Sequence, residues 1–189
     1  MIRKWFLGLS AAEEMSRHSN TVKMVMGAIL GGLAAIFQSA GLFGGAGYAL
    51  SILTTWPIII ACFLSVRIGL LTYLLTIMML AVLQPSELFV FPFTTGLLGI
   101  SIGIALNRLK RPLAAILFGG ASLTAGILFL LYVIGFPILG PSLSGYSALL
   151  TGGTIFLFGL AYSSIWLWLS LATMKALNRT VRKKSPEMT

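Results

Sequence analysis

Charged residues are almost missing from three long stretches of this sequence, residues 24–66, 68–107 and 112–174, in which Glu87 is the only one. The whole chain of 189 residues is 58% hydrophobic and only 9% charged, with a mean hydropathy of +0.99. Soluble domains carry roughly 25% charged residues, so this composition cannot cover a surface that faces water. We therefore expect an integral membrane protein.

Six segments are apolar and long enough to cross a bilayer as helices, which takes about 20 residues each. Turn-rich or charged stretches such as GLFGGAG, QPSE and NRLKRP separate them. The expected spans are Met24–Leu42, Tyr48–Val66, Ile68–Leu83, Leu88–Leu106, Leu113–Leu139 and Ser147–Met174. The predicted fold class is an all-α integral membrane protein with six transmembrane helices.

The positions of the basic residues predict the orientation. Six spans place all 13 Lys and Arg residues on one side of the membrane, before span one, between spans two and three, between spans four and five, and after span six. Short loops rich in Lys and Arg stay in the cytoplasm, so both termini are expected there. The net charge of +9 therefore reflects membrane topology, and we expect no nucleic-acid partner. The expected location is a bacterial cytoplasmic membrane.

Residues 23–175 are expected to form one membrane domain. An amphipathic cytoplasmic arm, residues 1–22, precedes it, and a basic cytoplasmic tail, residues 176–189, follows. In the arm, apolar residues recur at helical spacing, which is typical of a short helix on the inner leaflet: Ile2, Trp5, Phe6 and Leu9. The arm suits equally a role in setting topology alone.

The chain offers little for catalysis. It has no aspartate, one histidine, His18, in the arm, and one cysteine, Cys62, inside an apolar run. Catalytic sites usually combine two or more titratable groups, and metal sites need several ligands. We therefore expect no enzyme, no metal site and no cofactor.

Polar and aromatic residues gather toward the predicted outer side. Glu87 lies in the second outer connection, and an ionisable group at membrane depth is a candidate functional residue. The candidate substrate-binding residues are Gln38, Tyr48, Thr55, Trp56, Gln84, Glu87 and Tyr146. Two plainer interpretations stay open: Glu87 lies among lipid headgroups, and the aromatic and threonine side chains only pack inside the protein. Tyr162, Trp166 and Trp168 are expected to be interfacial anchors near the inner end of span six.

Span one contains two rows of small residues, Gly27–Gly31–Ala35 and, one residue later, Ala28–Gly32. Such spacing lets two membrane helices approach closely. The rows suit a docking face for a partner membrane protein, and they suit equally the packing of this protein's own bundle.

These features together resemble the substrate-binding S components of energy-coupling-factor (ECF) transporters. The run ALSILTTWPIIIACFLSVRIGLLTYLLTIMML is similar to the second and third helices of that family, and FPFTTGLLGISIGIALNRLKRP is similar to its glycine-rich fourth helix and basic inner loop. The resemblance covers roughly residues 22–175. It implies capture of a vitamin or related micronutrient from outside, followed by docking on a transmembrane T subunit that two ATPase subunits power.

The family's docking signature, Ala-xxx-Ala on the first helix, matches Ala28 and Gly32, where the glycine departs from the pattern. The resemblance also implies that the first outer loop, GLFGGAGYALS, covers an outward-facing pocket. No Lys or Arg lies within the spans or in the outer loops. We therefore expect a neutral or cationic ligand with an aromatic ring, because carboxylate-rich ligands usually require a cation.

Three other functions remain open. A six-span assembly or structural factor would bind no small molecule. A lipid-modifying enzyme would need a catalytic group at the interface, and a self-sufficient channel or carrier would work without ATPase subunits.

Overall fold

The computed structural model describes residue 15, residues 17–136 and residues 148–184, with the backbone alone for residues 148–149 and 177–184. Apart from turns, the described chain is helical. Its elements are α2 (Asn20–Ser39), η1 (Ala40–Phe43), α3 (Gly45–Ile52), α4 (Thr55–Leu64), α5 (Val66–Leu83), α6 (Glu87–Val90), η2 (Phe91–Phe93), α7 (Thr95–Leu109), α8 (Pro112–Phe129), η3 (Leu130–Ile134) and α9 (Ala148–Lys184). Helices satisfy their own backbone groups, as a segment in hydrocarbon must.

Six of these helical segments are long and apolar enough to span a membrane, which confirms the predicted number and the all-α class. They are Asn20–Phe43, Gly45–Leu64, Val66–Leu83, Glu87–Leu109, Pro112–Ile134 and Leu150–Ala176. The fifth ends earlier than the predicted Leu139, because Gly135 adopts a left-handed conformation with φ 73° just after Ile134.

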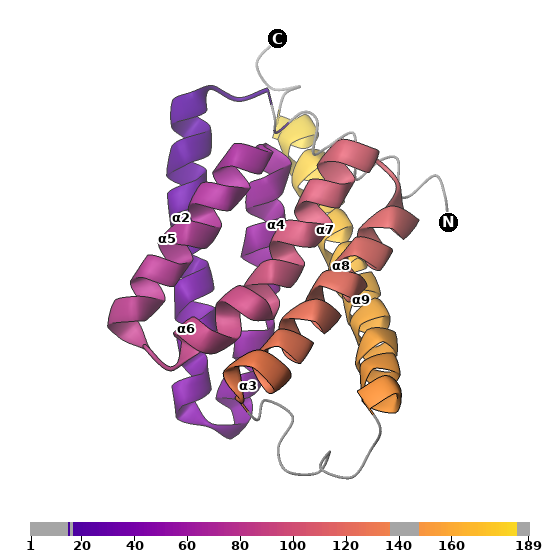
Figure 1. The fold of residues 1–189 in the computed structure, drawn as a ribbon. Helices are drawn as coiled ribbons and strands as arrows, with labels where there is room; N and C mark the ends of the chain where they lie inside the picture. Colours follow the sequence, from indigo (N-terminus) through magenta and orange to yellow (C-terminus); the bar gives the residue numbers. More distant parts are fainter. Residues whose placement is uncertain (1–14, 16, 137–147, 185–189) are drawn as a thin grey trace.

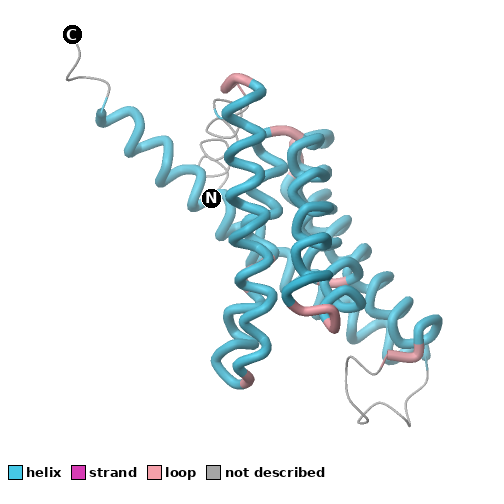
Figure 2. The backbone as a smooth tube through the Cα atoms, turned by 90° about the vertical axis from the view of Figure 1, so that its left-hand side faces the viewer, coloured by secondary structure: helices cyan, strands magenta, loops and turns pink. Residues whose placement is uncertain are grey.

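The helices run up and down in a bundle, with α2 and α5 on one side, α4 and α7 in the middle, and α8 and α9 on the other side (Figure 1). The start of α2, the α4–α5 and α7–α8 turns and the end of α9 lie at one end of the bundle. We call it the basic end, because Arg67 lies at the start of α5 and Arg108 in the last turn of α7. The α5–α6 turn with Glu87 lies toward the opposite end, the Glu87 end. The last turns of α9 extend beyond the bundle (Figure 2).

Glycines and threonines hold α2 against α5. The Thr72 hydroxyl donates to the Gly27 carbonyl over 3.1 Å, and the Thr76 hydroxyl donates to the Gly31 carbonyl over 3.3 Å. A Cβ at Gly27 would lie only 2.6 Å from Ile68 Cγ2, so the two helices approach closely only because the position is a glycine.

The central helix α4 is buried along most of its length. Cys62, fully buried, packs on Gly69 of α5 and Gly103 of α7, where any added Cβ would collide with its sulfur. Asn107 on α7 donates from Nδ2 to the Cys62 carbonyl over 2.7 Å. Three spans therefore meet around one small side chain.

Two spans are interrupted partway. Between α3 and α4, Thr54 donates its N–H to Ser51 and Trp56 donates its N–H to Leu53, over 3.2 and 3.1 Å. Each of these bonds joins residues three positions apart. Pro57 has no N–H to donate to the Leu53 carbonyl four residues earlier, so the N–H of Trp56 donates to it instead. The fourth span is interrupted at Thr94, between η2 and α7.

Candidate functional site

A chain of hydrogen bonds connects three of the spans near the Glu87 end. Gln38 Nε2 donates to Glu87 Oε2 over 2.7 Å, and Thr95 Oγ1 donates to Gln38 Oε1 over 3.0 Å. Thr55 Oγ1 donates in turn to the Thr95 carbonyl over 3.2 Å. We call Gln38, Thr55, Glu87 and Thr95 the Glu87 cluster. Its members come from α2, α4, α6 and α7.

The QPSE turn places Glu87 in this cluster. Pro85 forces the preceding residue out of helical geometry, and Gln84 accordingly has φ −153° and ψ 81°. The chain then turns, with the Glu87 N–H donating to the Gln84 carbonyl over 3.0 Å. Glu87 therefore begins α6 directly after α5 ends, and its carboxylate reaches α2.

The break at Thr94 places Thr95. Pro92 lies in the short 3₁₀ segment η2, and the Thr94 hydroxyl donates to the Val90 carbonyl over 2.7 Å. Tyr73 on α5 donates its hydroxyl to the Pro92 carbonyl over 3.0 Å, which fixes the break against the bundle. Helix α7 then begins at Thr95, with the threonine hydroxyl directed to Gln38.

The Glu87 cluster is largely withdrawn from the protein surface. Gln38 is 1% exposed and Thr55 is fully buried, whereas Glu87 and Thr95 are partly exposed. The only side-chain partner that Glu87 has among the described residues is the neutral amide of Gln38. The neighbouring basic residues in sequence, Arg67 at the start of α5 and Arg108 in the last turn of α7, lie at the basic end. Among the described residues, no basic side chain therefore pairs with the carboxylate.

Three buried polar atoms beside the cluster have no hydrogen-bond partner among the described residues. They are Ser39 Oγ, Thr54 Oγ1 and Gln84 Oε1. Ser39 follows Gln38, Thr54 precedes Thr55, and Gln84 bonds Glu87 through its backbone. Buried polar groups are normally paired, so these three atoms are candidates for hydrogen bonds from another molecule. Three atoms on α9, Ser163 Oγ, Trp166 Nε1 and Ser170 Oγ, are unpaired in the same way.

Tyr48 and Glu87 both lie close to Gly41. A Cβ at Gly41 would be 3.8 Å from Tyr48 Cδ1 and 4.0 Å from Glu87 Oε1. The ring is 65% exposed. Position 41, which carries no side chain, therefore lies between the Tyr48 ring and a carboxylate oxygen of Glu87.

The structure brings together five of the predicted binding residues, Gln38, Tyr48, Thr55, Gln84 and Glu87. It does not bring Trp56 to them, because Trp56 Nε1 donates to Thr173 Oγ1 on α9 over 3.2 Å. Tyr146 lies outside the described residues. Sequence reasoning missed Ser39 and Thr95. Pro92, three residues before Thr95, was the sequence signal that could have identified Thr95, because a proline interrupts a helix.

The two small-residue rows of α2 face different surroundings. Gly27, Gly31 and Ala35 are buried, and the two glycines contact α5, so their row packs this bundle and is not free for a partner. Ala28 is exposed, and a Cβ at Gly32 would meet nothing within 4 Å. Only the Ala28–Gly32 row presents small residues to the outside of the bundle.

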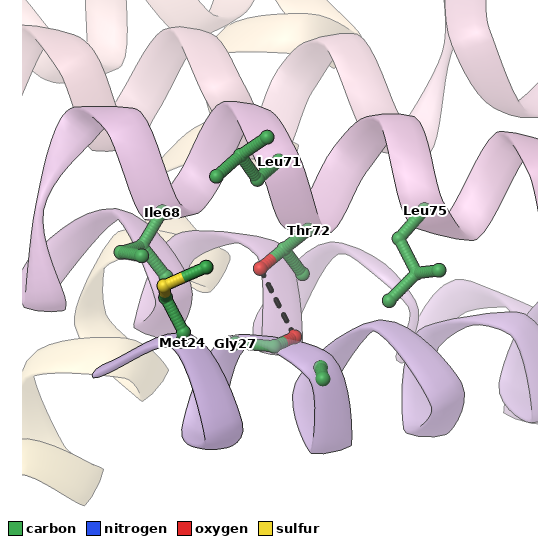
Figure 3. Close-up of a pocket in the computed structure, with 7 residues that line it drawn as sticks. Met24, Gly27, Ile68, Leu71, Thr72 and Leu75 are labelled. Atoms are coloured by element: carbon green, nitrogen blue, oxygen red, sulfur yellow. Dashed lines mark hydrogen bonds between the residues drawn. The ribbon is translucent and has the colours of Figure 1, made fainter. Parts of the chain in front are cut away.

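An apolar groove of about 260 Å³ lies between α2 and α5 near the basic end. Its walls are Met24, Gly27 and Ala28 on α2 and Ile68, Leu71 and Leu75 on α5 (Figure 3). The Thr72 hydroxyl at its base is bonded to the Gly27 carbonyl. The groove is therefore apolar and separate from the Glu87 cluster.

Comparisons of this chain with protein families, with curated proteins and with solved structures found no match.

Proposed function

We propose that this chain is the substrate-binding S component of an ECF-type transporter. It captures a vitamin or related micronutrient from outside the cell and passes it on while docked to a T subunit and two ATPases. It lies in a bacterial cytoplasmic membrane, with both termini and the basic end in the cytoplasm. The grouping of every basic residue on one side of six spans supports this orientation.

The observation that carries the proposal is the Glu87 cluster. The Glu87 carboxylate bonds a buried amide, and unpartnered buried oxygens lie nearby in sequence. An ionisable group at membrane depth lowers the stability of a membrane protein, so its presence favours a functional role. The cluster lies toward the end opposite the basic turns, which is the outer side in the proposed orientation. A site there meets external ligand directly.

The expected ligand is neutral or cationic and contains an aromatic ring. Among the described residues, the carboxylate of Glu87 has no basic partner, so it favours a donor or a positive charge on the ligand. The exposed ring of Tyr48, close to Glu87 across Gly41, supports stacking with an aromatic group.

The exposed Ala28–Gly32 row supports docking. Small side chains there let the backbone of a partner helix approach α2 closely. The neighbouring groove between α2 and α5 adds apolar surface on the same part of the bundle. In the proposal, the T subunit packs against this surface.

Ligand capture is tested by thermal unfolding of the purified chain with a panel of vitamins and precursors. One compound is expected to raise the unfolding midpoint saturably in the wild type and much less in Glu87→Gln. A panel without any shift would contradict capture. It would favour the alternative, a six-span assembly or structural factor.

Docking is tested separately by co-purification of the chain with the T subunit and ATPases. Ala28→Trp is expected to abolish the complex. Leu117→Trp, a bulky change at a 51% exposed position on α8, serves as the matched control and is expected to preserve it. Equal complex formation by both variants would remove the Ala28–Gly32 row from the interface.

A further inference from the structure

Three side-chain oxygens toward the Glu87 end have no hydrogen-bond partner among the described residues. Glu87 Oε2 accepts from Gln38, but the structure pairs no side-chain donor with Glu87 Oε1 among the described residues. Ser39 Oγ and Gln84 Oε1 are buried and unpartnered, and Gln84 as a whole is only 7% exposed. Glu87 Oε1 and Gln84 Oε1 can only accept, so a partner for them is a hydrogen-bond donor or a cation, whereas the Ser39 hydroxyl can donate as well as accept.

Helix register brings these oxygens to the same end of the bundle. Thr72 bonds Gly27 and Thr76 bonds Gly31, so α2 and α5 run in the same direction with a constant offset along the contact. Continued outward, the same offset sets Ser39 opposite Gln84. The Gln84 carbonyl in turn accepts from the Glu87 N–H over 3.0 Å. The register and this bond therefore group Ser39, Gln84, the C-cap residue of α5, and Glu87 at the same end of the bundle.

The end of α5 adds negative potential. Pro85 has no N–H, so the Ala81 carbonyl one turn earlier lacks its usual helical donor. The unsatisfied carbonyls at a helix C-terminus carry a partial negative charge, equivalent to about half an elementary charge. Ends of helices inside membrane proteins use such carbonyls to coordinate monovalent cations.

No basic side chain of the described residues pairs with these oxygens. The sequence has no Lys, Arg or His between Arg67 and Arg108 or between Lys23 and Arg67. A partly buried carboxylate beside unpaired acceptors is stabilised when a cation binds it. The Tyr48 ring near Glu87 adds a face that attracts cations.

We propose that Glu87 Oε1, Gln84 Oε1 and Ser39 Oγ form a binding site for a single positive charge. A sodium ion and the ammonium group of an organic ligand share this chemistry. The ammonium source rests on the proposed function, because it makes the cation part of the captured compound. The sodium source does not rest on it.

The test is thermal unfolding of the full chain in detergent at equal concentrations of sodium, potassium, methylammonium and benzylammonium chloride. One of these cations is expected to raise the unfolding midpoint saturably. Selectivity for sodium over potassium identifies a metal-ion site, and selectivity for the organic cations identifies a ligand ammonium. Equal, unsaturable effects of all four salts would overturn the proposal.

Variants make the test specific for these oxygens. Glu87→Gln keeps an acceptor for Gln38 and is expected to remove the saturable shift. Gln84→Met, similar in size but without the amide oxygen, is expected to weaken cation affinity by about tenfold, as loss of one hydrogen bond to a charged group does. Glu13→Gln, which removes a carboxylate from the N-terminal arm, is the matched control and is expected to bind like the wild type. A shift that survives Glu87→Gln would overturn the proposal.

The outcomes separate this inference from the proposed function. A selective sodium effect without any bound vitamin or T-subunit complex would retain the cation site and contradict the S-component role. Capture of a neutral vitamin without any cation effect would support the S-component role and contradict the cation site.

Discussion

The bond between Gln38 and Glu87 provides a quantitative test of how deeply the Glu87 cluster is buried. The test is a double-mutant cycle that compares four proteins: the wild type, Gln38→Met, Glu87→Gln and the variant with both substitutions. Both substitutions preserve side-chain size closely. The free energy of unfolding is measured for each protein by steric trapping or by titration with SDS in mixed micelles.

The structure sets the expected magnitude. Gln38 is 1% exposed and its Nε2 lies 2.7 Å from Glu87 Oε2. Hydrogen bonds to charged groups contribute about 1.5–3 kcal/mol, whereas neutral interhelical bonds in a membrane protein average about 0.6 kcal/mol. Glu87→Gln converts the first kind of bond into the second. We therefore expect a coupling free energy of about 1–2 kcal/mol.

Gln38→Met also removes the acceptor of the Thr95 hydroxyl, which donates to Gln38 Oε1 over 3.0 Å. That loss occurs in both proteins of the cycle that carry Gln38→Met, so it cancels from the coupling free energy. A coupling below about 0.3 kcal/mol would show that water or headgroups screen the pair, as exposed charged pairs are screened. It would refute the view that Glu87 is held inside the bundle.

Two further predictions concern the bundle itself. Gly27→Ala is expected to destabilise the protein by about 1–3 kcal/mol, because the new methyl group would lie 2.6 Å from Ile68 Cγ2, whereas Gly32→Ala, with nothing within 4 Å, is expected to be neutral or slightly stabilising in the same unfolding assay. In a Cys62→Ala background, the single variants Arg67→Cys and Ser86→Cys are expected to react with an impermeant maleimide from opposite sides of the membrane; labelling of both from one side would contradict the six-span topology.

The number of spans and most of their limits could be predicted from the sequence, because charge and hydropathy alone decide which segments suit hydrocarbon. The irregular ends could not. The predicted fifth span continued to Leu139, although the helix ends at Ile134, where the backbone turns left-handed at Gly135. Apolar composition continues past that point, so hydropathy gives no signal for the end.

Which face of a helix meets which neighbour was harder to predict. Trp166 was expected at the interface but is 3% exposed in the core between α4, α7, α8 and α9, whereas Trp168 is 64% exposed. In lipid, both faces of a helix are apolar, so periodicity does not distinguish them. For the same reason, the sequence did not show which neighbour Trp56 faces. We grouped it with the binding residues, and in the structure its indole N–H donates to Thr173 on α9.

The polar residues were easier to interpret, because each is exceptional in an apolar chain. Gln38 and Glu87 were both singled out by type and predicted depth. Their direct contact, across 49 positions of sequence, needed the structure. Thr95 escaped notice because a threonine bonded to its own helix is routine in membrane spans, and only the break at Thr94 directs its hydroxyl to another span.

The most direct test of the central claim is native mass spectrometry of the protein, purified from its own cells in mild detergent without added ligand. If Glu87 forms part of a capture site, the wild type is expected to carry a non-covalently bound small molecule with the mass of a vitamin or precursor. Most of that molecule is expected to be lost from Glu87→Gln and retained by Glu13→Gln. A wild-type protein that carries no small molecule and gains none from a vitamin panel would contradict the account.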